Sequence, residues 1–286
     1  MITLKQFLTL TKFKLSFVVS LSLVFGFILA KNSIDFSIIN PFLAVLLLAL
    51  GVSALNQVQE YKEDALMPRT KKRPIARGVI SVQKGLFISI SLMFLGFIFI
   101  YLSLNILGLV IFTFVVLTYN LLYTKAKKIT IYAAVYGAIL GIVPPLIGWL
   151  SANGQVTNIG FIALALFYFI WQIPHFWLLT LKYHKEYEKA SFPTVVKKFG
   201  IQGLERITFV WLLLTLISGM FLVLIFSQQS IIITTLLILT NIYTLYLIFK
   251  LLKEHNYLKT FIGINSYMLI LMTLLITNSL IYNWLD

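Results

Sequence analysis

Three side chains with oxygen donors stand four residues apart near the end of an apolar stretch. They are Asn56, Glu60 and Asp64. If the helix predicted over residues 39 to 59 continues beyond its apolar part, they share one face, with successive members roughly 6 Å apart along the axis. Mg²⁺ prefers oxygen ligands and typically binds through one or two carboxylates plus substrate phosphates. The spacing therefore predicts a magnesium site on this face.

Basic residues follow this acidic face directly. The segment Met67–Pro74 contains Arg69, Lys71, Lys72 and Arg73, whose guanidinium and ammonium groups are suited to diphosphate oxygens. A carboxylate-bound metal beside such cations indicates a diphosphate site. The same residues would also fit a solvated loop beside anionic lipid headgroups, and the spacing alone leaves both interpretations open.

A second acidic segment, residues 182 to 189, follows the apolar stretch 159 to 181, just as the first acidic row follows the apolar stretch 39 to 59. It contains Glu186 and Glu188, so these two loops hold five of the nine acidic residues of the chain. Loop charges that only set membrane topology are basic, and topology does not require acids here. Paired placement of this kind is typical of an internal repeat whose halves face one cavity.

The composition shows what kind of scaffold positions these residues. The 286 residues are 60% hydrophobic and 11% charged, with a mean hydropathy of +0.95, whereas about a quarter of residues are charged in soluble domains. The chain has no cysteine, which excludes thiolate metal sites and thiol nucleophiles. It also lacks the P-loop, Rossmann and H-E-x-x-H patterns, so ATP-driven pumps and metalloproteases of those types are excluded.

Uncharged apolar runs of the length needed to cross a bilayer, about 20 residues, recur along the chain. Nine are found, near 15 to 30, 39 to 59, 86 to 104, 106 to 123, 131 to 150, 159 to 181, 207 to 227, 230 to 252 and 260 to 282. They lack strict alternation, and helices satisfy their own backbone hydrogen bonds in lipid. We therefore expect an all-α polytopic membrane protein, a bundle of about nine transmembrane helices forming a single domain over residues 1–286.

The basic residues orient this bundle, because Lys and Arg collect on the cytoplasmic side. Of the 23 basic residues, 22 fall on one face of the nine-span arrangement, and only Lys31 falls on the other. The N-terminus and both acidic loops are then cytoplasmic, and Asp286 lies outside. The net charge of +14 is explained by topology, so no nucleic-acid partner is expected. The first span lacks a small residue at Ile28, which favours a retained helix over a cleaved signal peptide.

The stretch Asn56–Pro74 resembles the signature of the protoheme IX farnesyltransferases, or heme O synthases, a branch of the intramembrane prenyltransferase superfamily. It follows the pattern N-x-x-x-[DE]-x-x-x-D-x-x-M-x-R-T-x-x-R-P. The second half of the pattern fits this branch better than the other members of the superfamily, which share mainly the acidic part. The resemblance extends over residues 50 to 195. The further matching stretches are Tyr123-Thr124, Gly137–Gly141, Pro144-Pro145, Gly148-Trp149 and Trp171-Gln172-Ile173-Pro174-His175.

The resemblance implies a nine-helix bundle around a central cavity in which Mg²⁺ holds farnesyl diphosphate and the farnesyl carbon meets a vinyl group of heme B. The product would be heme O, for handover to a heme A synthase or a terminal oxidase, in a bacterial inner membrane. The implied catalytic set is Asn56, Glu60, Asp64 and Glu186, with Glu60, Asp64 and Glu186 as metal ligands and Arg69, Lys72 and Arg73 as diphosphate ligands.

Three positions depart from the family pattern. Glu60 stands where the family usually has Asp, and Gln57 replaces a common second Asn. Lys185 occupies the place of the first of two Asp before Tyr187. The second acidic motif therefore depends on Glu186, and these departures leave room for a divergent specificity or an impaired enzyme.

Other interpretations of the same residues remain open. His175 lies within a predicted span, where it is either a heme-facing ligand or a histidine hydrogen-bonded between helices. The acceptor of the prenyl group could also be another molecule, such as a quinone precursor. A secondary transporter would place ionisable groups deep in several spans, and those are nearly absent here. A purely structural membrane subunit would leave the clustered acids unexplained.

Overall fold

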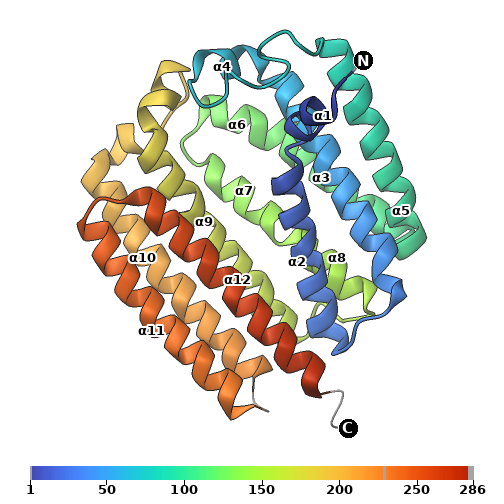
Figure 1. The fold of residues 1–286 in the computed structure, drawn as a ribbon, viewed down its shortest axis with the longest axis vertical. Coiled ribbons are helices and arrows are strands. Elements are labelled where there is room, and N and C mark those ends of the chain that lie inside the picture. The colour runs from blue at the N-terminus through green and yellow to red at the C-terminus, as the bar shows by residue number, and fades with distance from the viewer. Residues whose placement is uncertain (1, 228–229, 283–286) are drawn as a thin grey trace.

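The computed structural model describes residues 2–227 and 230–282, and over that part it is helical without strands (Figure 1). Asp286, predicted to lie outside the cell, falls beyond the described residues. The helices in chain order are α1 Leu4–Leu10, α2 Phe13–Lys31, the 3₁₀ turn Phe36–Ile38, α3 Ile39–Gln59, α4 Tyr61–Leu66, α5 Val82–Val116, the π-helix Leu117–Tyr123, α6 Thr124–Ile129, α7 Ala133–Gly141, α8 Val143–Ser151, α9 Ile159–Lys189, α10 Val195–Phe226, α11 Ile231–Lys253 and α12 Tyr257–Tyr282. The all-α prediction is confirmed.

Helix α5 is a hairpin and crosses the membrane region twice. Its backbone leaves the helical conformation at Asn105, where φ is 49° and ψ is −137°. Beyond that residue the chain doubles back, because the rings of Phe97 and Phe112 are 5.7 Å apart, whereas 15 residues of straight helix would separate them by about 22 Å. The described part contains eight helices long and apolar enough to cross a membrane. With the hairpin they make nine crossings, as the sequence predicts.

The fifth predicted span differs from expectation because it consists of two helices, α7 and α8. They meet at Ile142, and Pro144 and Pro145 lie in the first turn of α8. Proline lacks a backbone N–H and is accommodated in a first turn, where that donor would have no intrahelical partner. The break therefore follows from the sequence, although hydropathy alone did not show it.

The helices follow one another around the bundle, and the last packs against the first. Helix α2 contacts α3 and α8 on one side and α12 on the other. The side chain of Ser279 on α12 donates a hydrogen bond of 2.6 Å to Asn32 Oδ1, at the end of α2. Figure 1 shows α12 beside α2, with α1, α4 and α6 gathered at the opposite end of the molecule from the end of α12. The first and last helices are thereby joined in one body.

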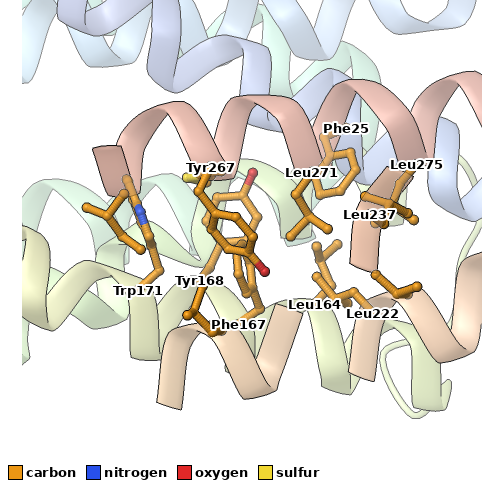
Figure 2. Close-up of a cluster of buried hydrophobic side chains, with 14 of the residues drawn as sticks. Phe25, Leu164, Phe167, Tyr168, Trp171, Leu222, Leu237, Tyr267, Leu271 and Leu275 are labelled. Atoms are coloured by element: carbon orange, nitrogen blue, oxygen red, sulfur yellow. The ribbon is translucent and has the colours of Figure 1, made fainter. Parts of the chain in front are cut away.

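A buried cluster of apolar side chains holds α9 to α12 together and includes Phe25 from α2 (Figure 2). Tyr267 is fully buried there, and its hydroxyl donates to Asn241 Oδ1 at 3.2 Å. Gly219 permits this approach, since a Cβ at that position would lie 1.9 Å from the Tyr267 hydroxyl. Small residues at such contacts let membrane helices pack closely. This packing fixes α9, which carries His175 and Glu186.

Candidate functional site

The acidic row lies where α3 gives way to α4. Asn56 is in the last turn of α3, Asp64 is in α4, and Glu60 between them has φ −114° and ψ 13°. The helix predicted over residues 39 to 59 therefore does not continue unbroken through the three residues, which was the condition for their sharing one face. The N–H of Glu60 still donates to Asn56 O at 3.0 Å, and that of Asp64 to Glu60 O at 2.8 Å, so the three residues keep their succession. Their exposed fractions are 2%, 5% and 1%, in chain order.

Lysines from two other segments face the first two members of the row. Lys12, in the turn between α1 and α2, donates to Asn56 Oδ1 at 3.0 Å. Lys127 on α6 places Nζ 2.6 Å from Glu60 Oε1. That oxygen is buried, and its contact with the ammonium group is an ion pair. The amide of Asn56 also contacts Thr124 Oγ1 at 3.4 Å.

Arg73 is the cation that faces Asp64, the third member of the row. Nη1 of Arg73 lies 2.7 Å from both carboxylate oxygens of Asp64. The backbone oxygen of Asp64 accepts a hydrogen bond of 2.9 Å from Thr70 Oγ1. The loop that follows α4 therefore folds around Asp64, and Arg73 is engaged by this carboxylate.

The two carboxyls of the row have different pKa values. Burial would raise the pKa of Glu60, but the charges of Lys127 and Lys12 outweigh it, and the pKa lies below its usual value. Burial raises the pKa of Asp64, and the charge of the neighbouring Glu60 raises it further. The charge of Arg73 lowers this pKa but does not outweigh the burial. Burial also lowers the pKa of Lys12 to about 7, together with the charges of Arg73 and Lys127. The site thus holds Glu60 firmly ionised.

The second acidic segment contacts the first loop through Arg69. The backbone N–H of Arg69 donates to Glu186 Oε2 at 3.2 Å. Its guanidinium group lies 5.2 Å from the ring of Tyr183 and reaches the Tyr187 hydroxyl at 3.4 Å. Lys72, predicted to bind diphosphate, is exposed on this loop. The structure therefore brings the two loops together, as their paired placement in the sequence suggested.

Within the described residues, no three His, Asp or Glu side chains converge closely enough to hold a metal ion. Glu186 is held by the Arg69 backbone and does not join the other two acids. Joint ligation by Glu60, Asp64 and Glu186 thus stays a prediction. The donors fit Mg²⁺ by their chemistry, since the row presents amide and carboxylate oxygens.

A cavity of about 160 Å³ adjoins the row beside Lys127. Its other lining residues include Tyr123, Phe176, Trp177 and Tyr187. The ammonium group of Lys127 lies 4.9 Å from the centre of the Tyr123 ring. Lys127 therefore connects the row to an aromatic pocket, which it lines together with residues of the π-helix, α7 and α9. A charged group beside aromatic side chains suits a ligand with a charged head and an apolar chain.

His175 lies within the membrane part of α9 and is hydrogen-bonded to another helix. Its Nδ1 is 3.1 Å from Asn265 Oδ1 on α12. The amide nitrogen of Asn265 donates to Phe261 O at 2.5 Å, which fixes the amide so that its oxygen faces the ring. Nδ1 must then carry the proton, and Nε2 keeps its lone pair. The interhelical hydrogen bond is present, and it leaves Nε2 available as a ligand.

Two residues of the site, Lys12 and Lys127, were missed by the sequence analysis, which used them only as topology signals. Lys127 closely follows the matching stretch Tyr123-Thr124 and could have been found from it. Lys12 carries no comparable signal, because it lies 44 residues from its partner Asn56. Its place in the site depends on how α2 packs beside α3.

Comparisons with known proteins agree with this architecture. The sequence model of the UbiA prenyltransferase family matches residues 15–284. A protoheme IX farnesyltransferase from Nitratidesulfovibrio vulgaris is 34% identical over 209 residues, which are 73% of each chain. A solved structure of a digeranylgeranylglyceryl phosphate synthase has a TM-score of 0.76 and 20% identity, covering 97% of this chain and 98% of the other. A UbiA homologue from Archaeoglobus fulgidus bound to GPP and Mg²⁺ has a TM-score of 0.65 and 13% identity, covering 96% and 98%.

Proposed function

The chain belongs to the UbiA prenyltransferase family, and from this we propose that it transfers the farnesyl group of farnesyl diphosphate to a vinyl group of heme B, giving heme O and diphosphate. The observation that carries the proposal is the buried row Asn56, Glu60 and Asp64, in which each member faces a cation. One of these cations, Lys127, also lines an aromatic pocket. The name of the 34% identical relative supports the heme acceptor.

The reaction breaks the bond between C1 of the farnesyl chain and its diphosphate oxygen, and the electron pair leaves with the diphosphate. A carbon–carbon bond then forms between C1 and the terminal vinyl carbon. The remaining vinyl carbon becomes cationic, takes up water and loses a proton, which gives the hydroxyl group of the product. The aromatic lining of the pocket keeps bulk water from the allylic cation until it meets the acceptor.

The charges of the site favour departure of the diphosphate. Lys12, Lys127 and Arg73 are gathered around the row, and fixed cations stabilise a leaving group whose negative charge grows in the transition state. We assign diphosphate binding also to Arg69 and Lys72. Mg²⁺ held by oxygens of Asn56, Glu60, Asp64 and Glu186 would neutralise the diphosphate further when bound.

We assign His175 as the ligand of the heme iron. The hydrogen bond to Asn265 places the proton on Nδ1, and a neutral imidazole whose second nitrogen is held by a hydrogen bond is the usual form of a metal-bound histidine. Trp171 and Phe261 lie with ring centres 4.9 and 4.7 Å from the imidazole. These rings would contact the porphyrin plane beside the ligand.

The chain spans the membrane many times, and we propose that residues 1–286 form one domain in a bacterial inner membrane. The contact of α12 with α2 supports a single domain. The basic loops support a cytoplasmic N-terminus and a cytoplasmic site. Heme O formed there would pass to a heme A synthase or a terminal oxidase.

The test is a membrane assay with heme B, farnesyl diphosphate and Mg²⁺, in which hemes are followed by mass. We expect the parent to form a farnesylated, hydrated heme, and Glu60→Ala and Asp64→Ala to lose it. Glu63→Ala is the matched control, because Glu63 lies between them and pairs with Lys128, outside the row.

Binding of farnesyl diphosphate without any heme product would contradict the acceptor and direct the search to quinone precursors. A parent that binds no prenyl diphosphate would contradict the proposal that the chain catalyses prenyl transfer.

A further inference from the structure

Gln57 joins the site helix α3 to the N-terminal helix α1. Its side chain is 1% exposed, and its amide nitrogen donates to Thr9 O at 2.8 Å and to Leu10 O at 2.9 Å. These carbonyls belong to the last turn of α1, where a helix has no partners of its own for its final oxygens. Two carbonyl oxygens can accept only from the NH₂ group, so the orientation of the amide is fixed. Gln57 therefore caps α1 from a neighbouring helix.

The turn that follows α1 holds Lys12 in an unfavourable backbone conformation. Its φ is 48° and its ψ is 45°, a left-handed conformation that is unfavourable for a residue other than glycine. Glycine would be the ordinary choice at such a turn. The side chain of Lys12 instead uses this geometry to reach Asn56 Oδ1 at 3.0 Å.

Helix α1 depends on α3 for its position. It has seven residues, and isolated helices shorter than about 12 residues are marginal in water. Leu10 is fully buried against Ala54 of α3, together with Ile75 and Ile80. Without the Gln57 amide, the buried Leu10 O would lose this partner, and an unsatisfied buried group is destabilising. Thr9 O would keep only the backbone N–H of Lys12, at 3.3 Å.

We propose that Gln57 is a positioning residue, which fixes the end of α1 so that the ammonium group of Lys12 is held over Asn56 to bind the diphosphate of the prenyl substrate. The role of the diphosphate rests on the proposed function. Gln57 itself touches no substrate, and its Oε1 is buried and accepts no hydrogen bond from the described residues. Its function is therefore carried by its two N–H donors.

The first measurement tests the cap without any substrate. Because the chain has no cysteine, a spin label at Leu8→Cys on α1 reports on this helix alone. Gln57→Met keeps the side-chain length and removes the donors, and we expect it to increase the mobility of the label. Gln59→Met is the matched control, since Gln59 donates at 3.0 Å to Asn120 O and has no bond to α1. Equal mobility in the parent and Gln57→Met would overturn the cap.

The second measurement tests the link to Lys12 by binding of farnesyl diphosphate with Mg²⁺. Loss of one charge-assisted hydrogen bond predicts an affinity about 10-fold weaker for Lys12→Met. Gln57→Met should weaken binding by a similar factor and should lower turnover at saturating substrate no more than Lys12→Met does, because Gln57 acts only through Lys12. The double variant should bind no more weakly than Lys12→Met alone, because both changes remove one interaction. If the Gln57→Met variant does not fold, the same binding measurement is made with Gln57→Glu, which also lacks the NH₂ group.

Each failure has a different meaning. A parent that binds no farnesyl diphosphate contradicts the proposed function, while the spin label still tests the cap. Normal affinity in Gln57→Met, or losses of affinity that multiply in the double variant, would overturn the positioning role although the parent binds.

Discussion

Replacing Arg73 by methionine removes the cation from the most buried acid of the row. Asp64 is 1% exposed, and both of its carboxylate oxygens lie 2.7 Å from Arg73 Nη1. Breaking a buried ion pair on one side costs about 3–5 kcal/mol. Both contacts come from one nitrogen and the Arg73 side chain is 19% exposed, so we expect about 3 kcal/mol. For a chain of this length, that corresponds to a fall of about 6 °C in Tm.

The assay is thermal unfolding of the protein in lipid nanodiscs, followed by tryptophan fluorescence. Asp64→Asn removes the buried charge, so the double variant should regain most of the stability that Arg73→Met loses. Prenyl transfer should stay absent in the double variant, because the carboxylate is needed for it. Lys72→Met is the control, since Lys72 is exposed on the same loop. The reasoning is refuted if Arg73→Met is as stable as Lys72→Met, or if Asp64→Asn does not restore stability.

Three further outcomes follow from the geometry. A Cβ at Gly148 would lie 2.0 Å from a backbone oxygen of α2, so Gly148→Ala should lower Tm by several degrees, whereas Gly263→Ala, which meets no atom within 4 Å, should leave Tm nearly unchanged. His175→Ala should shift the Soret band of bound heme, with a smaller shift for Asn265→Leu, and an unchanged spectrum in His175→Ala would contradict iron ligation. Because the pKa of Lys12 is about 7, its ammonium loses the proton as the pH rises above this value; affinity for farnesyl diphosphate should then fall, and Lys12→Arg should flatten that dependence in binding titrations.

The sequence by itself determined the membrane architecture. Every span must present a long apolar run to lipid, because a charged side chain or a polar group without a hydrogen-bond partner is energetically unfavourable there. The number of crossings could therefore be counted from hydropathy, including the hairpin at Asn105. The acidic row and the basic cluster were also visible, because residues four apart remain neighbours along the chain even across the break at Glu60.

Only the tertiary structure decided which groups complete the site. The break at Glu60 is not encoded by local periodicity, and hydropathy gave no sign of the division between α7 and α8. Lys12 and Lys127 reach the row from helices distant in sequence, and Gln57 acts on α1 through two backbone carbonyls. Periodicity and spacing describe one element at a time, whereas these contacts depend on which helices pack together. The packing of the helices therefore determines which cations lie beside the row.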